Sequence, residues 1–134
     1  MSSIVIALPK IEDARKIRSV LERHGFAVAS VCSTASNALS SASELGSGVL
    51  ICGHRLPDMN YLDLAECMPR DFEMLLLASA RVICEVPPSI LLVEMPMKAS
   101  DLVNTVSMIL MQQERKRRRE KKKPKLRTEK EQNY

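Results

Sequence analysis

Short apolar runs alternate with amphipathic stretches along the first 112 residues, and this alternation limits the fold more than any other feature of the sequence. The runs 4–8 and 49–52 contain no charged side chain and no hydroxyl or amide, which is typical of central parallel strands buried on both faces. Further strands are predicted at 26–31, 72–78 and 89–94, and helices at 11–24, 34–45, 58–68 and from about residue 100. Strands that alternate with helices form parallel βαβ units, so the sequence predicts a three-layer α/β sandwich.

Two helix starts and one crossover are the local details that the sequence suggests. Thr34 or Ser36 is predicted to cap one helix, and Asp58 or Asn60 the next, because their side-chain oxygens can accept hydrogen bonds from backbone N–H groups. The crossover between the fourth and fifth strands spans only residues 79–88 and includes two prolines. A parallel crossover normally needs about a dozen residues or more, so a single turn or irregular loop, a reduced fourth helix, is predicted there.

The charge is divided unevenly between two parts of the chain. Residues 114–134 hold eleven Lys and Arg against four Glu, a net charge of +7, whereas residues 1–113 hold nine basic and twelve acidic side chains, a net charge of −3. Such a segment could neutralise several phosphates of a nucleic acid. The candidate residues are Arg115, Lys116, Arg117, Arg118, Arg119, Lys121, Lys122 and Lys123. Because no aromatic side chain is interleaved to stack on bases, a solvated helical linker is the favoured interpretation.

The last predicted helix carries both an apolar stripe and this basic segment. No Gly or Pro interrupts residues 101–123, so a helix of about 35 Å is expected, ending at Pro124. The spacing of Thr128 and Glu131 matches a capping box, so a further helix and more chain are expected beyond it. The apolar stripe is predicted to face inward and to pair partly with the same helix of a second copy; it consists of Leu102, Val103, Val106, Ile109 and Leu110.

Several classes of protein are disfavoured by what the sequence lacks. No apolar run is long enough to span a membrane, and no basic start precedes a signal-type core, so a cytoplasmic location without membrane contact is expected. The four cysteines at 32, 52, 67 and 84 contain no Cys-x-x-Cys pair, which argues against a zinc site or a disulfide framework. All four are interpreted as buried thiols. No metal and no cofactor are expected.

Two segments resemble receiver domains of bacterial two-component response regulators. Residues 49–59 resemble the third receiver strand and its loop, and residues 92–97 resemble the fifth strand and its Lys-Pro turn. More narrowly, the chain is similar to the receiver-like domain of ANTAR-type transcription antitermination regulators, in which a basic helix leads into an RNA-binding bundle. The resemblance implies a flavodoxin-like (CheY-like) sandwich with strand order 2-1-3-4-5. It also implies a degenerate receiver domain at 1–112 and a basic helical linker at 113–134.

The resemblance assigns each part of receiver chemistry to one position. The position of the phospho-acceptor aspartate falls on Gly53, those of the Mg²⁺-binding carboxylates on Leu8 and Pro9, and that of the lysine after the fifth strand on Met95. Only Ser79 has the type of side chain that a receiver needs at its position. Phosphoryl transfer needs oxygen ligands for Mg²⁺ and a carboxylate nucleophile. A pseudo-receiver without aspartyl phosphorylation and without enzyme activity is therefore predicted. Asp58, Asp63 and His54 lie nearby, but a helix cap, a surface charge and an inert loop histidine are the favoured interpretations.

Three function classes follow from these features. The leading hypothesis is a non-catalytic signalling module that acts by dimerisation and partner contact and is coupled to RNA binding by an output domain after the basic helix. The alternative is a free-standing interaction domain whose basic tail binds nucleic acid directly. A flavin enzyme is disfavoured, because the chain has no Gly-rich phosphate loop and no Trp.

Overall fold

The computed structural model describes residues 3–79, 86–87, 90–95 and 98–131, and the side chains of the last range up to residue 115. Five parallel strands form one sheet in the order β2-β1-β3-β4-β5, so the predicted strand order is confirmed. Every pair of neighbouring strands is parallel. The strands are β1 (Ser3–Ala7), β2 (Val28–Cys32), β3 (Ser47–Gly53), β4 (Asp71–Ser79) and β5 (Leu91–Met95).

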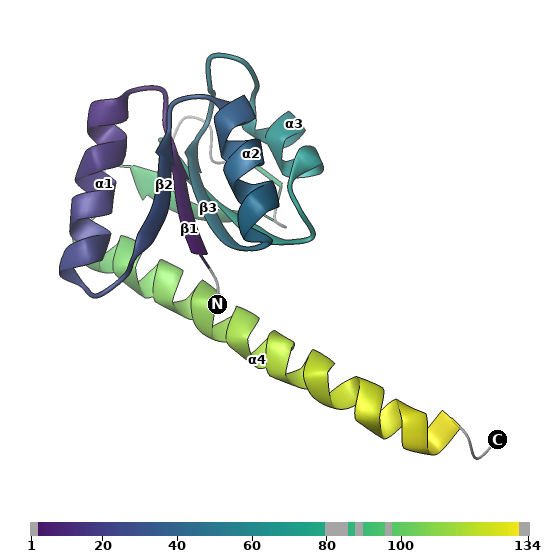
Figure 1. Cartoon of the computed structure of the whole chain (residues 1–134). Helices are drawn as coiled ribbons and strands as arrows, with labels where there is room; N and C mark the ends of the chain where they lie inside the picture. The colour runs from purple at the N-terminus through teal and green to yellow at the C-terminus, as the bar shows by residue number, and fades with distance from the viewer. Residues whose placement is uncertain (1–2, 80–85, 88–89, 96–97, 132–134) are drawn as a thin grey trace.

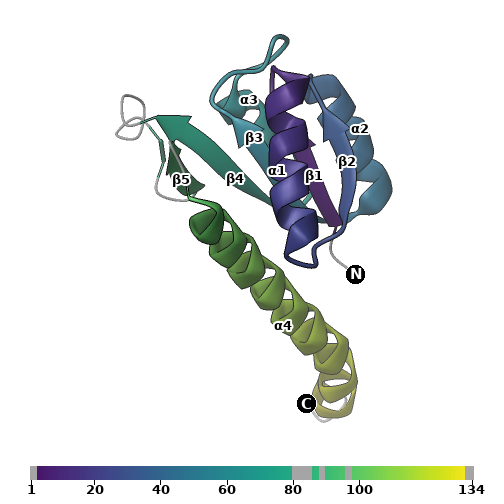
Figure 2. The ribbon, with the colours of Figure 1, turned by 90° about the vertical axis from the view of Figure 1, so that its left-hand side faces the viewer.

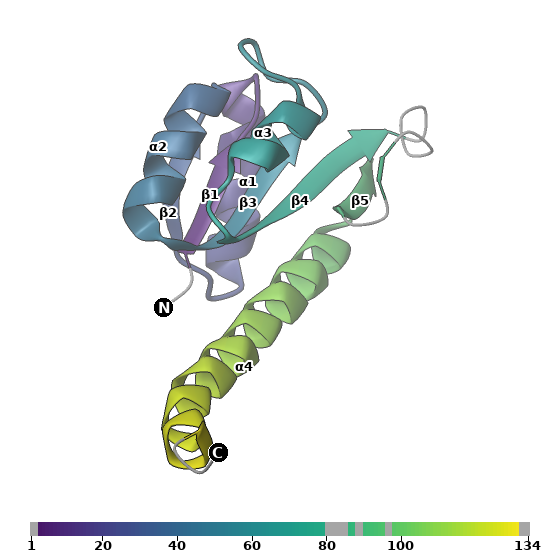
Figure 3. The same ribbon diagram turned by 90° about the vertical axis from the view of Figure 1, so that its right-hand side faces the viewer.

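Helices cover both faces of the sheet, as the predicted sandwich requires (Figure 1). Helices α1 and α4 pack on one face, which is nearer the viewer in Figure 2, and α2 and α3 pack on the other, as Figure 3 shows. The assigned helices are α1 (Ile11–Arg23), α2 (Ala35–Leu45), α3 (Tyr61–Cys67) and α4 (Ala99–Glu131).

The two predicted caps are Thr34 and Asn60. The Thr34 hydroxyl accepts a hydrogen bond from the Asn37 N–H at 3.3 Å, and the Asn60 side-chain oxygen accepts one from the Asp63 N–H at 2.9 Å. These bonds satisfy N–H groups that have no partner inside the first turn. Gly46 ends α2 at φ +83°, a left-handed conformation that other L-residues adopt at a cost.

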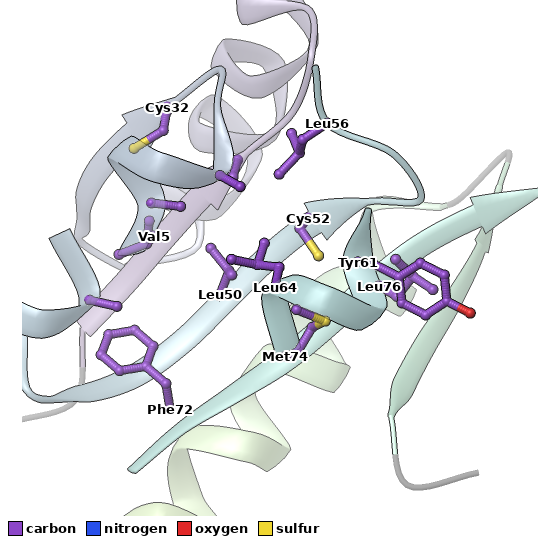
Figure 4. Close-up of a cluster of buried hydrophobic side chains, with 14 of the residues drawn as sticks. Val5, Cys32, Leu50, Cys52, Leu56, Tyr61, Leu64, Phe72, Met74 and Leu76 are labelled. Carbon is purple, nitrogen blue, oxygen red and sulfur yellow. The ribbon is translucent and has the colours of Figure 1, made fainter. Parts of the chain in front are cut away.

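The core has two halves because successive residues of a strand point to opposite faces. In β3, Leu50 and Cys52 face α2 and α3, whereas Val49 and Ile51 face α1 and α4. All four are fully buried, and no polar or charged side chain is buried among the described residues. Figure 4 shows the half under α2 and α3, where the rings of Phe72 and Tyr61 lie among aliphatic and sulfur-containing side chains. The prediction of strands buried on both faces is thus confirmed.

Helix α4 is held against the sheet by one stripe. Leu102, Val106 and Ile109 are each at most 1% exposed. One turn later, the Gln113 side-chain Nε2 donates to the carbonyl oxygens of Gly48 at 2.7 Å and of Asp71 at 3.3 Å. These carbonyls lie at the amino ends of β3 and β4. The packed part of α4 therefore reaches Gln113, one residue past the predicted domain boundary.

Of three expectations about the rest of the chain, the structure contradicts one and does not test the other two. The assigned helix continues through Pro124, where an end was expected; a proline inside a helix loses one backbone hydrogen bond and costs about 3 kcal/mol. The role of the basic segment 116–131 as a linker stays a prediction, because its side chains lie outside the described residues and the described contacts hold α4 to the sheet only as far as Gln113. The reduced fourth helix falls on residues 79–88, most of which lie outside the described residues.

The prediction that all four cysteines are buried is wrong for Cys67. Cys32 and Cys52 are buried, but Cys67 is exposed at the end of α3. The reason is the phase of this short helix, since Ala65 and Met68 occupy the positions that pack against the core. Cys84 lies outside the described residues.

Candidate functional site

The sheet brings the predicted receiver positions together at the carboxyl ends of its strands. Leu8 directly follows β1, Gly53 ends β3, Ser79 ends β4 and Met95 ends β5. Ser79 lies opposite Met95 in the β4–β5 register. Because parallel strands end at one edge, residues far apart in the sequence meet there, and ligands of open α/β sheets bind at this edge. The structure thus places these four positions at one edge of the sheet, and their assignment to a receiver pocket stays a prediction.

The centre of this edge is filled by apolar side chains. A Cβ atom built on Gly53 would lie 3.2 Å from Leu8 Cδ2 and 3.7 Å from Pro9 Cδ. Leu8 is only 8% exposed and belongs to the core cluster on the face of α1 and α4. Leu8 and Pro9 therefore occupy the space into which a larger side chain at residue 53 would grow. We call this arrangement of Leu8, Pro9 and Gly53 the apolar plug.

The outer part of the edge remains open to solvent. Ser79 is exposed, and Met95 is 38% exposed at the end of β5. A methionine thioether carries no charge and is only a weak hydrogen-bond acceptor. At the position that the resemblance assigns to a lysine, the chain therefore presents apolar surface beside one hydroxyl.

The donor set at this edge does not fit Mg²⁺. This ion prefers six oxygen ligands, usually with one or two carboxylates, and the apolar plug supplies no side-chain oxygen. No group of three or more His, Cys, Asp and Glu residues that could hold a metal is found among the described residues. No step of the chemistry is therefore assigned to a metal at this edge.

Asp58 is the carboxylate on the loop after β3, and it is engaged elsewhere. Its two carboxylate oxygens accept hydrogen bonds from the Ala35 N–H at 2.8 Å and the Ser36 N–H at 3.0 Å, at the start of α2. These two backbone donors hold the pKa of the Asp58 carboxyl below its ordinary value. Asp58 is therefore a cap, as predicted, but it caps α2 and not the helix that follows it. Sequence reasoning missed this partner because the contact joins residues 23 positions apart.

The remaining candidate groups near the edge are also accounted for. The His54 ring packs on the Tyr61 ring, with 5.3 Å between centroids and an interplanar angle of 40°. Asp63 is exposed on α3. Burial raises the pKa of the Cys52 thiol to about 12, and a thiol is nucleophilic only as the thiolate. Beside the plug, Cys52 is thus an inert apolar side chain.

The candidate dimer residues divide into two groups. Leu102, Val106 and Ile109 are buried in the chain's own core, whereas Val103 and Leu110 are half-buried against it. The first three are therefore used by the fold. Gln113 was not among the candidates. Its signal was its position four residues after Ile109, which continues the inward stripe with a polar side chain that needs hydrogen-bond partners.

The nucleic-acid candidates are described at one position. Arg115 is exposed on α4, and the side chains of Lys116, Arg117, Arg118, Arg119, Lys121, Lys122 and Lys123 lie outside the described residues. A role for this segment in nucleic-acid binding stays a prediction. None of the described helices is both long enough and apolar enough to cross a membrane.

No protein-family model matches the sequence, and no curated protein matches it. Solved structures are similar to it. A CheY-like response regulator receiver domain protein from Methanospirillum hungatei JF-1 is 12% identical with a TM-score of 0.71, and the match covers 85% of this chain and 98% of that one. The signal receiver domain of an HD domain-containing protein from Pseudomonas fluorescens Pf-5 is 16% identical with a TM-score of 0.76, covering 88% and 93%. A Rhodopirellula baltica structure described as adenylate cyclase is 14% identical with a TM-score of 0.74, covering 90% and 96%.

The chain has the CheY-like receiver fold. Several structures of proteins described as response regulator receivers share it over four-fifths or more of this chain. At 12–20% identity the likeness establishes the arrangement of helices and strands and leaves the activity to be argued from the site.

Proposed function

We propose that this chain is a receiver-type signalling module of the cytoplasm that works without aspartyl phosphorylation, a pseudo-receiver. The observation that carries the proposal is the apolar plug, in which Gly53 lies where the acceptor carboxylate of a receiver is expected and Leu8 Cδ2 lies 3.2 Å from the place of its missing Cβ. The module is not an enzyme; it acts through association with partners.

The chemistry of phosphoryl transfer supports this reading. The transferred group is stabilised by positioning and by opposite charge, and the edge offers neither a carboxylate nucleophile nor oxygen ligands for a cation. Asp58 does not replace them, because its oxygens are engaged by the Ala35 and Ser36 N–H groups. The apolar plug contains no group that could accept a phosphoryl group, so Ser79 would have no phosphorylated side chain to contact.

Helix α4 is proposed to couple this domain to the output domain. Leu102, Val106 and Ile109 fix the first half of the helix on the sheet, and Gln113 holds its last packed turn to Gly48 and Asp71. The basic segment that follows then joins the domain to an RNA-binding output domain, as in the ANTAR-type regulators that the sequence resembles. Self-association through α4 is part of this proposal.

Incubation with acetyl phosphate and Mg²⁺ tests the absence of phosphorylation directly. The intact mass of the chain is measured before and after, with a phosphorylatable receiver domain in the same tube as a positive control. We expect the control to gain one phosphoryl group and this chain to gain none. Stoichiometric labelling that disappears in Asp58→Asn or Asp63→Asn would overturn the proposal, because it would identify a working acceptor.

The net charge of +7 at residues 114–134 favours one second function, direct nucleic-acid binding by the tail. RNA binding of the full chain is compared with that of a chain ending at Gln113, over a range of salt concentrations. The signalling proposal expects weak binding that does not depend on RNA sequence and falls steeply with salt. Tight binding to a defined RNA that is lost on truncation would favour the second function.

A further inference from the structure

The outer face of α4 carries a line of exposed side chains that the fold does not use. Asp101, Asn104, Met108, Met111 and Arg115 follow one another at steps of three and four residues, and all five are exposed. Met108 is 44% and Met111 is 54% exposed, the two highest values among the large exposed hydrophobic side chains described. Steps of three and four place side chains along one line of a helix, as at the a and d positions of a coiled coil. We call these five residues the outer seam.

The outer seam lies opposite the stripe that packs on the sheet. The inward stripe contains Leu102, Val106 and Ile109, all buried, and at 100° per residue the seam points to the other side of the helix. A partner on the seam would therefore not contact the sheet or displace α4 from it. In Figure 2, α4 lies at the edge of the molecule, next to β5 and away from β2.

The two ends of the seam carry opposite charges. Asp101 lies at its amino end and Arg115 fourteen residues later at its carboxyl end, about 21 Å along the axis. Met108 lies midway between them. Among the described residues the ion pair recorded is Arg18–Glu22, so neither Asp101 nor Arg115 has an ionic partner within the described part of the chain. The seam is thus complementary to itself when one copy is turned end to end.

We propose that the outer seam binds the outer seam of a second copy of this chain, with the two helices antiparallel about a two-fold axis at Met108. In this arrangement Asp101 of each copy faces the partner's Arg115, and Met108 and Met111 fill the centre. The inference rests on the dimer that the proposed function includes, and it specifies which surface makes the dimer and in which direction the helices run.

Charge decides the direction of pairing. A parallel pair would set Asp101 against the partner's Asp101 and Arg115 against the partner's Arg115, which is repulsive at both ends. It would also send two segments of net charge +7, residues 114–134, away from the same end of the dimer. An antiparallel pair places these segments at opposite ends and lets the helix dipoles oppose one another.

The small number of side chains in the outer seam predicts a weak dimer. Each copy contributes two methionines at the centre and one charge at each end, less than a stable obligate interface buries, so a dissociation constant on the order of 100 μM is expected. A dimer of this strength responds to local concentration, which an attached output domain or a bound RNA would raise.

Sedimentation of the full chain between about 10 μM and 1 mM tests the pairing. We expect a monomer–dimer equilibrium that Met108→Asp weakens about tenfold or more, because the two introduced carboxylates meet at the two-fold axis. Leu62→Asp is the matched control, since Leu62 is 43% exposed on α3 and lies off the seam. Circular dichroism checks that both variants remain folded. A chain that is monomeric at about 1 mM, or a dimer that Met108→Asp leaves unchanged, would overturn the proposal.

A charge exchange tests the direction. Asp101→Arg and Arg115→Asp should each weaken the antiparallel dimer about tenfold, whereas the double variant should recover most of the lost affinity because opposite charges face one another again. In a parallel dimer each residue faces the same residue of the other copy, so the charge exchange would restore no affinity. A double variant that dimerises as weakly as the single variants therefore contradicts the antiparallel arrangement. Neither result bears on labelling by acetyl phosphate, so this inference and the absence of phosphorylation can fail separately.

Discussion

Replacing Gly53 by aspartate tests the apolar plug most directly, because it introduces the side chain that the resemblance to receivers assigns to this position. The Cβ of the new residue would lie 3.2 Å from Leu8 Cδ2, a few tenths of an ångström closer than an ordinary contact, and the carboxylate would extend further into the plug. Leu8 is 8% exposed and must move toward solvent to make room. Burying a leucine side chain is worth about 1.5–3 kcal/mol, so Gly53→Asp should reduce the free energy of unfolding by about 2–3 kcal/mol.

Two further variants separate this cause from others. Gly53→Ala should change the free energy of unfolding by less than about 1 kcal/mol, because a single methyl group displaces only the end of a flexible side chain and the lost flexibility of glycine offsets the contact. Leu8→Ala should cost about 2–3 kcal/mol through lost burial and a partly filled cavity. In the double variant Leu8→Ala/Gly53→Asp the aspartate occupies the space that Leu8 leaves. The double variant should therefore cost less than the sum of the two single variants, by about 1 kcal/mol or more.

Urea denaturation followed by far-ultraviolet circular dichroism measures these differences, since the chain has no Trp. Equal slopes of the transitions would show that the variants unfold from comparable states. Two results would refute the reasoning: a Gly53→Asp variant as stable as the original chain, or costs of the two single variants that add fully. Either would mean that Leu8 does not fill the space beside Gly53.

Three other variants and measurements test separate parts of the structure. The pKa of Asp58 is lowered in the folded state. The contribution of this carboxylate to stability is therefore present above the unfolded-state pKa of about 3.9 and is lost as pH falls through the folded-state pKa. In urea titrations the stability difference between the original chain and Asp58→Asn should be full at pH 7 and shrink below about pH 4. Ile109→Ala should cost about 2–4 kcal/mol because Ile109 is 1% exposed, whereas Met108→Ala on the outer seam should change stability by less than about 0.5 kcal/mol. A thiol reagent should modify Cys67 in the folded chain much faster than Cys52, whose pKa is raised to about 12 by burial; equal rates measured by mass spectrometry would contradict the burial of Cys52.

The fold was predictable because it follows from local signals. Strands buried on both faces appear in the sequence as unbroken apolar runs, and the parallel order then fixes which strand ends meet. Gly53 and Leu8 were placed at one edge through the resemblance to receiver domains, before their distance was known. The packing of Leu8 into the space beside Gly53 was not predictable, since it depends on a side-chain conformation.

The contacts that sequence reasoning missed join residues distant along the chain. Asp58 was one of two candidates, with Asn60, for capping the helix that follows it, but its carboxylate caps α2, 23 residues earlier. Gln113 reaches Gly48 across 65 positions. No periodic pattern in the sequence identifies the partner of either side chain, because one polar side chain and one backbone group suffice for a hydrogen bond. The error at Cys67 has another origin, since a one-residue shift in the phase of a seven-residue helix decides which side chain faces the core.

The positions of the apolar plug and of the α4 anchor bear on where control of the proposed module would act. The plug lies at the carboxyl end of β3, and Gln113 binds the Gly48 carbonyl near its amino end, so about 17 Å of strand separates them. In the pseudo-receiver proposed above no phosphorylation occurs at the plug, and an event on α4 itself would need no transmission across the sheet. Met108 lies five residues before Gln113 on the same helix, so pairing at the outer seam would act directly on the segment from which the basic tail leaves the domain.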